Sequence, residues 1–364
     1  MSNLEAVYLD VLRQHGVDPD APIPRVEATV DQMRAAGAPE DIIEQLIERL
    51  PKTLKEQYDP VLKPIQRDVK ADAKILGASW KGDILVGGLP TNARNASAQK
   101  VAGGYLILVN WGLIQLLHQL AKVFLSSAHL VMVAHGDEEV PMAFADRLGF
   151  MPTDWTKEDA LIAVAEIYRS LLAGDITMAP SCPIVAMQHE LHFYHTMLTH
   201  AERFVVSHEF AHVLSGDCEI EERAGDLHDI QRKQQAELNA DTLAVRLLFA
   251  SVDFSKDDPE VLEDAQLRAV GMSLVFLSNW IAECCQNLHK GLSWDDDKME
   301  THPHLQRRLH NGRASARKWY GPITDYMDIF TTWAWGVVLP VVGELADDND
   351  LRKMAAYSPA IRFD

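Results

Sequence analysis

The segment Val206–Gly216 reads Val-Ser-His-Glu-Phe-Ala-His-Val-Leu-Ser-Gly, and its pattern decides how the rest of the chain is understood. His208 and His212 are four residues apart, so on a helix they lie on one face, one turn apart. Their imidazole nitrogens can bind a single metal ion, and Glu209 is placed to hold a water molecule beside it. Gly216 stands where a helix C-cap is expected. The opposite face carries apolar residues at helical spacing, namely Val206, Phe210 and Val213.

A His-Glu-x-x-His match also arises by chance, in roughly a few per cent of chains with this content of His and Glu. The alternative is a pair of core or surface histidines that bind nothing. A second helical stretch favours the metal site, because its Glu237 and Asp241 are four residues apart and share one face. Zinc held by two histidines needs a third protein ligand, and Glu237 fits that role. Asp241 can then accept a hydrogen bond from the outer ring nitrogen of a zinc-bound histidine.

Other ligand arrangements are less consistent with the spacing. A third histidine six residues after the second would mark another class of zinc protease, but Cys218 occupies that position. Cys218 as a ligand is the weaker alternative to a buried thiol. His189, His192 and His195 recur every third residue, which spreads them around a helix. We therefore expect polar core or surface histidines there rather than a second metal site.

The composition is that of an ordinary globular chain, with 364 residues of which 47% are hydrophobic. The net charge of −19 argues against a broad basic surface, so no nucleic-acid partner is expected. Four cysteines without framework spacing and a first segment without a targeting pattern favour the cytoplasm. The apolar stretches Tyr105–Leu125 and Ile329–Gly343 are interrupted by polar residues or too short for the ~20 residues of a spanning helix. We therefore expect a soluble protein without a membrane span.

Helical and strand patterns divide the chain into three predicted parts. Residues 1–72 are typical of an N-terminal helical module, residues 73–320 of the metal-binding domain, and residues 321–364 of a C-terminal helical extension. The module carries no recognisable chemistry, so a scaffold or a contact with an activating partner is its expected role. Its predicted helices end at Gly16 and span Arg25–Ala36 and Pro39–Leu50.

Within residues 73–320 the pattern indicates a mostly helical α+β fold with a small sheet. Asp83–Gly88 and Tyr105–Asn110 are predicted strands, joined by a connection rich in Asn, Ala and Gly. Thr156 with Asp159 predicts a capping box at a helix start. The block Ile184–Leu214 is predicted to be helical, with a candidate break near Thr199.

Two motifs together, His208-Glu-Phe-Ala-His212 and Glu237-Leu-Asn-Ala-Asp241, resemble the gluzincin zinc metallopeptidases. The likeness extends to the subgroup that includes the HtpX-type proteases. Residues 95–98 and 103–113 are similar to its Asn-Ala-Phe-Ala, Gly-Gly, strand and Gly-Leu pattern. Thr301–Leu309 is similar to its His-Pro-x-x-x-x-Arg-Ile element, with His302 and Arg308 on the matching positions. The resemblance covers about residues 83–310 and implies a zincin-like metallopeptidase fold.

The chain departs from that subgroup in two respects. The subgroup is usually membrane-embedded, whereas no membrane span is expected here. Four additional residues also lie between residues 95–98 and the double glycine. The chain also resembles the soluble Lit-type phage-exclusion protease, which cleaves elongation factor Tu. These resemblances imply a zinc-dependent endopeptidase that acts on a protein substrate through a metal-activated water. Zinc would be held by His208, His212 and Glu237, and Glu209 would be the general base.

The resemblance implies further roles in the same reaction. His302 or Arg308 is the candidate to stabilise the developing oxyanion, and a salt bridge from Arg308 to an acid of the site is the alternative. Tyr105–Asn110 is expected to be an edge strand that aligns an extended substrate by main-chain hydrogen bonds. The alternative function is a pseudoprotease, a zincin-fold module that binds or senses without catalysis. The presence of Glu209 argues against that alternative.

Overall fold

The computed structural model describes residues 3–21, 34, 40, 53–56, 59–130, 132–133, 142–143, 154–172, 188–219, 227–255, 258–289 and 305–320. Several predictions from the sequence fall outside these ranges. They are His302, the C-terminal extension 321–364 with its apolar stretch Ile329–Gly343, and, apart from Arg34 and Glu40, the helices predicted over Arg25–Ala36 and Pro39–Leu50.

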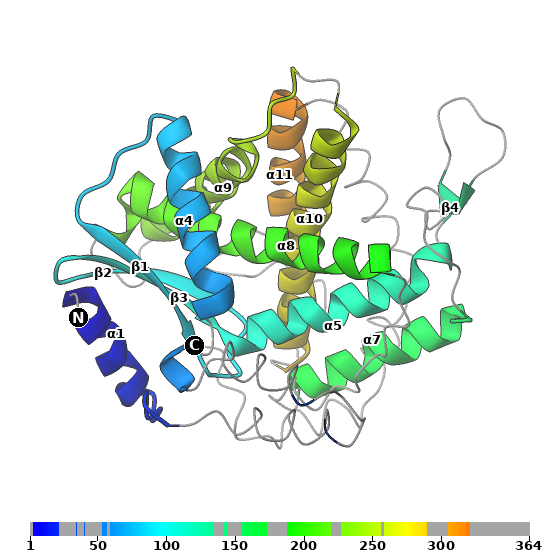
Figure 1. Cartoon of the computed structure of the whole chain (residues 1–364), viewed down its shortest axis with the longest axis horizontal. Helices are drawn as coiled ribbons and strands as arrows, with labels where there is room; N and C mark the ends of the chain where they lie inside the picture. The colour runs from blue at the N-terminus through cyan, green and yellow to red at the C-terminus, as the bar shows by residue number, and fades with distance from the viewer. Residues whose placement is uncertain are drawn as a thin grey trace.

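A three-stranded mixed sheet covers one side of the helical body (Figure 1). Its strands are β1 (Asp83–Leu89), β2 (Ala96–Val101) and β3 (Gly104–Asn110), in the order β1-β3-β2. β3 pairs with β1 in parallel and with β2 in antiparallel orientation. β3 is therefore the central strand, and the prediction that Tyr105–Asn110 is an edge strand is wrong.

The wrong prediction for β3 arises from β2, which lies in the segment that was predicted to be a connection between strands. Ala96–Val101 is poor in the β-branched and aromatic residues that mark strands, yet it pairs with β3 along its whole length. The reversal between β2 and β3 falls at Gly103, whose φ of 95° is a conformation that L side chains rarely adopt. β2, half-buried to exposed, forms one edge of the sheet, and β1 forms the other.

The helix α1 (Asn3–Gln14) packs against one face of this sheet. Tyr8 and Leu12 lie in a small apolar cluster with Leu89, Leu106 and Leu108. The hydroxyl of Tyr8 also donates a hydrogen bond of 2.7 Å to the main-chain oxygen of Gly88. The beginning of the predicted N-terminal module is thus packed onto the sheet. α1 ends before Gly16, as predicted.

The opposite face of the sheet meets the main core, which the helices fill. Its largest fully buried side chains are aromatic and include Phe124, Phe204, Phe210, Phe249 and Phe276. The helices are α4 (Asp59–Ile75), α5 (Trp111–Ser127), α7 (Lys157–Leu172), α8 (Gln188–Ser215), α9 (Leu227–Phe249), α10 (Pro259–His289) and α11 (Leu305–Tyr320). Short elements are η1 (Leu54–Glu56), η2 (Ala128–Leu130), η4 (Asp217–Glu219) and the paired strands β4 (Met132–Val133) and β5 (Met142–Ala143).

The long helix α8 passes through the middle of this body and contacts α4, α5, α9 and α10 (Figure 1). It continues through Thr199, whose hydroxyl donates to the main-chain oxygen of His195, so the candidate break there is wrong. The capping box is confirmed, because the carboxylate of Asp159 accepts from the main-chain nitrogen of Thr156 at 2.7 Å. The boundary predicted at residue 72 falls inside α4, and the division into three parts stays a prediction.

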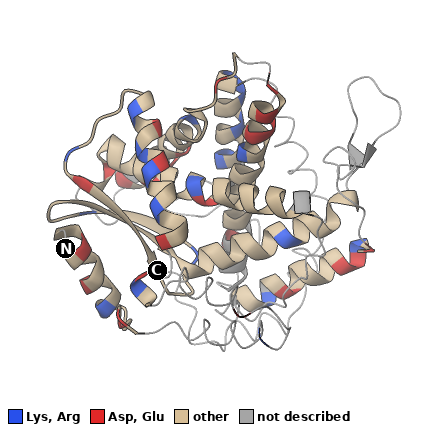
Figure 2. Cartoon of the chain, viewed as in Figure 1, with Lys and Arg blue, Asp and Glu red and all other residues tan. Residues whose placement is uncertain are grey.

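The architecture is a mostly helical α+β fold, as the sequence predicted. Among the helices of the described ranges, none combines the length and the apolar character required to cross a membrane. Lys, Arg, Asp and Glu residues are spread over the helices rather than separated by sign into two halves (Figure 2).

Candidate metal centre

The helix α8 presents His208 and His212 on one face and buries the other. Val206, Phe210 and Val213 are at most 4% exposed and lie in the main core, as their helical spacing predicted. The helix ends at Ser215, and Gly216 follows with a φ of 77°. A packed apolar face and a defined end therefore fix the two imidazoles, whose Nε2 atoms lie 3.2 Å apart.

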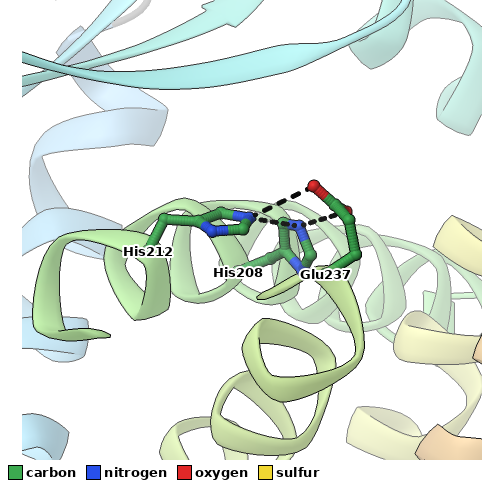
Figure 3. A group of neighbouring side chains, drawn as sticks. All are labelled: His208, His212 and Glu237. Carbon is green, nitrogen blue, oxygen red and sulfur yellow. Dashed lines mark hydrogen bonds and ion pairs between the residues drawn. The ribbon is translucent and has the colours of Figure 1, made fainter. Parts of the chain in front are cut away.

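The second helix α9 brings Glu237 to these imidazoles (Figure 3). Oε2 of Glu237 lies 3.4 Å from Nε2 of His208, and its Oε1 lies 3.5 Å from Nε2 of His212. One ligand atom from each of the three residues lies within 4.8 Å of the other two. In the described part of the chain this is the one group of His, Cys, Asp and Glu side chains arranged to hold a metal ion.

Asp241 lies behind the first histidine, one turn further along α9. Its Oδ1 is 3.0 Å from Nδ1 of His208, on the side of the ring that faces away from Glu237. Arg308 of α11 holds the same carboxylate with two hydrogen bonds, of 2.8 Å from Nε and 2.7 Å from Nη2. Although burial opposes it, Arg308 holds the pKa of Asp241 below its ordinary value. Asp241 is thus an ionised carboxylate beside the outer ring nitrogen of His208.

Arg308 makes a salt bridge with the acids of the site. Besides Asp241, its Nη1 lies 3.4 Å from Oε2 of Glu237. Of the two roles considered for Arg308, the observed contacts match the ion pair. Its guanidinium joins the third helix, α11, to the ligand-bearing α9, and it shares the carboxylate of Glu237 with the two histidines.

Asp217 lies beside the second histidine as Asp241 lies beside the first, and the sequence did not predict it. Its Oδ2 lies 3.0 Å from Nδ1 of His212. The residue is five positions past His212, beyond the end of α8, so helical spacing does not predict the contact. The sequence did contain one signal for this contact, an acidic residue directly after the glycine that ends the helix. At such a glycine the chain can turn back towards the face that carries the histidines.

Glu209 lies between the two histidines in sequence and is buried, with 8% of its surface exposed. Burial raises the pKa of its carboxyl, although the nearby His208 and His212 act in the opposite direction. A carboxylate whose proton affinity is raised is better suited to accept a proton near neutral pH. Glu209 does not belong to the group of three that could hold a metal.

Other candidate ligands lie apart from this centre. Cys218 points its sulfur to the main-chain oxygen of Ala98, at 3.6 Å, and is not part of the metal-binding group. His192 and His195 are exposed on the first half of α8, as expected for surface histidines. The exposed Asn239, between Glu237 and Asp241 in sequence, bonds to Gln235 instead of to the site.

The donor set of the centre fits zinc. Two imidazole nitrogens and one carboxylate are the ligands of many catalytic zinc sites, which leave a further position open. Each histidine has a carboxylate at its other ring nitrogen, Asp241 for His208 and Asp217 for His212, as zinc-bound histidines usually do. Without metal, Asp241 and Glu237 outweigh burial and raise the pKa of His208 to about 10. Zinc held by this ring would therefore displace a proton from it.

Comparison with known proteins adds one finding to this geometry. No curated protein and no solved structure matches the chain. A family model does match, over residues 147–317, and it describes the Peptidase U49 family. The matched stretch includes α7 to α10 and most of α11, and with them His208, Glu209, His212, Glu237, Asp241 and Arg308. Over this stretch, which carries the whole candidate metal centre, the chain is similar to a family of peptidases.

Proposed function

We propose that the chain is a zinc-dependent endopeptidase that hydrolyses peptide bonds of a protein substrate. The observation that carries the proposal is the convergence of His208, His212 and Glu237 from two helices, with the buried carboxyl of Glu209 beside them. The similarity to a peptidase family over the same residues supports it. Zinc, when bound, supplies a Lewis acid that polarises the scissile carbonyl and increases the acidity of a coordinated water.

The side chains of this site have separate roles in such a reaction. Glu209 accepts a proton from the attacking water and passes it to the leaving amine. Asp241 and Asp217 hold the two imidazoles in orientation through their outer nitrogens. Arg308 keeps Asp241 ionised and adds positive charge near Glu237. An extended substrate that pairs with the sheet on the side of the metal helix would do so along β2, because β3 already has a partner on both sides.

The experiment compares the wild-type protein with Glu209→Gln at equal zinc content. Both should contain about one zinc per chain, because Glu209 is not among the metal-binding residues. Proteolysis should fall by a factor of roughly 10²–10⁴ in the variant, as the loss of a positioned general base predicts. The substrate is sought by proteomic comparison of cells that express the two proteins.

A second pair of variants tests the metal itself. His208→Ala with His212→Ala should abolish stoichiometric zinc, measured by metal analysis of the purified protein. Full zinc occupancy in this double variant would refute the ligand assignment. Equal rates of cleavage by wild type and Glu209→Gln would refute the catalytic mechanism and favour a binding module.

A further inference from the structure

The turn η4, Asp217–Glu219, begins where α8 ends and lies against both the metal centre and the sheet. Gly216 makes the reversal possible, because its φ of 77° is strained for any residue with a side chain. The main-chain nitrogen of Glu219 then donates to the oxygen of Gly216 at 3.0 Å, which closes the turn. Through this reversal Asp217 returns to His212, which lies one turn before the end of the helix.

The two residues after Asp217 attach the turn to the sheet. The thiol of Cys218 is directed to the main-chain oxygen of Ala98 in β2, at 3.6 Å. The carboxylate of Glu219 accepts a hydrogen bond of 2.6 Å from the hydroxyl of Tyr105 in β3. Consecutive side chains therefore contact the second histidine, the edge strand and the central strand, in that order.

The contact between Glu219 and Tyr105 is the shorter of the two attachments to the sheet. Tyr105 is 4% exposed and belongs to the central strand, so its position is set by the core. The hydrogen bond to Glu219 raises the pKa of Tyr105 to about 12 and lowers the pKa of Glu219. Lys100 also approaches Glu219, at 3.1 Å, but both side chains are about half exposed, and such pairs contribute little.

We propose that η4 is a strap that positions His212: Glu219 fixes the turn to the sheet through Tyr105, and Asp217 transmits that fixed position to the imidazole. Asp217, Glu219 and Tyr105 are thus positioning residues, which act on the reaction through His212. The inference rests on the proposed function, because it takes His212 as a zinc ligand. The competing explanation is that the strap stabilises the fold without any effect on the histidine.

The first experiment measures zinc affinity by competition with a chromophoric chelator. Asp217→Asn should weaken zinc binding roughly 10–100-fold, the usual effect of losing the partner of a metal-bound histidine. Tyr105→Phe should cause a smaller loss, and the double variant should bind zinc no more weakly than Asp217→Asn alone, because both act through one contact. Glu219→Gln keeps an oxygen acceptor for Tyr105 and should retain most of the affinity that Glu219→Ala loses.

The matched control is Tyr8→Phe. Tyr8 also donates its hydroxyl to the sheet, to the main-chain oxygen of Gly88, but from the opposite face. Its loss should lower the stability of the fold and leave zinc affinity unchanged. If Tyr105→Phe behaves like Tyr8→Phe, with a lower unfolding midpoint and wild-type zinc affinity, the proposal is overturned.

A second readout needs no metal and separates this inference from the proposed function. In the metal-free protein at alkaline pH, where the imidazole is neutral, Asp217 should hold the proton of His212 on Nδ1. The ¹⁵N shifts of the ring report that tautomer, and Asp217→Asn and Tyr105→Phe should each shift the ring towards a mixture. An unchanged tautomer in both variants would refute the strap even if zinc binds as proposed. Absence of zinc from the wild type would refute the proposed function. The tautomer measurement would then decide alone whether η4 positions His212.

Discussion

At the scale of single residues, the candidate ligand group could be predicted because a helix converts sequence spacing into geometry. His208 and His212, like Glu237 and Asp241, are four residues apart, and each pair shares a helix face wherever the helices lie. That the two faces meet is a property of the tertiary structure, which the need of a two-histidine zinc site for a third ligand and the likeness to known motifs both anticipated. Asp217 was missed because its contact depends on a chain reversal after the helix, where spacing carries no such information.

Asp241 provides the sharpest test at this scale. Asp241→Ala should weaken zinc binding roughly 10–100-fold, since His208 loses the partner of its outer nitrogen. The same change leaves Arg308 with Glu237 as its remaining acid in the centre, at 3.4 Å, so that the guanidinium competes with zinc for this carboxylate. Asn239→Ala, on the same helix but exposed, should leave zinc affinity unchanged. Equal losses in the two variants, measured by competition titration, would contradict this account of Asp241.

At the scale of elements, the helix α8 was predicted better than the sheet, although it continues through the break expected near Thr199. α8 has a clear apolar face and a glycine stop, and both appear in the structure. β2 was missed because an edge strand that is half exposed needs few of the residues that mark a buried strand. Its omission also reversed the interpretation of β3, which has a partner on each side. A strand order is a property of pairing, and one strand's composition does not determine it.

The close approach of α8 and α10 depends on a residue without a side chain. A Cβ at Gly271 of α10 would lie 2.7 Å from the main-chain oxygen of Met197 and from the nitrogen of Ala201 in α8. Gly271→Ala therefore forces the two helices apart and should lower the free energy of unfolding by about 1–3 kcal/mol, as overpacking typically does. Urea denaturation of the purified variant measures the change.

Gly312→Ala is the control for this prediction. A Cβ at Gly312 of α11 would meet only the ring of Phe276, at 2.9 Å, and a side chain can move where a backbone cannot. Both substitutions bring the same gain in helix propensity, about 1 kcal/mol. Gly271→Ala should thus be clearly the less stable of the two, and the reverse order would mean that the helices separate at little cost.

At the scale of the whole molecule, a buried group of charges joins four helical segments away from the candidate metal centre. Asp72 of α4 is 2% exposed and pairs with Arg203 of α8. Arg268 of α10 donates to the last turn of α9, at the main-chain oxygen of Leu248. Both arginines contact the hydroxyl of Ser251, at 3.5 Å and 3.2 Å. The sequence did not predict this group, because Asp72 and Arg203 are 131 residues apart and only tertiary packing brings them together.

Asp264 is joined to this group by Arg268, at 2.7 Å, and its carboxylate lies 2.9 Å from the ring of His200. Through these two residues the group makes the stability of the molecule sensitive to acid. Burial lowers the pKa of His200, so the unfolded chain takes up this proton first, and stability falls as the pH drops below about 6.5. Burial alone would raise the pKa of Asp264, but His200 and Arg268 outweigh it and hold the pKa at about 2. Its contribution is present above the unfolded value of about 4 and is lost as the pH falls towards 2.

Both groups therefore act in the same direction, and removing one of them gives a test with a definite sign. His200→Gln should be less stable than the wild type at pH 7, because a buried hydrogen bond to Asp264 is lost. Its free energy of unfolding should nevertheless decline less steeply between pH 7 and pH 2, since the histidine no longer titrates and the pKa of Asp264 moves back towards its ordinary value. Urea unfolding at intervals of one pH unit measures both slopes, with His195→Gln, exposed on the same helix, as the control that should follow the wild type. A slope in His200→Gln as steep as that of the wild type would show that this cluster does not set the acid sensitivity of the fold.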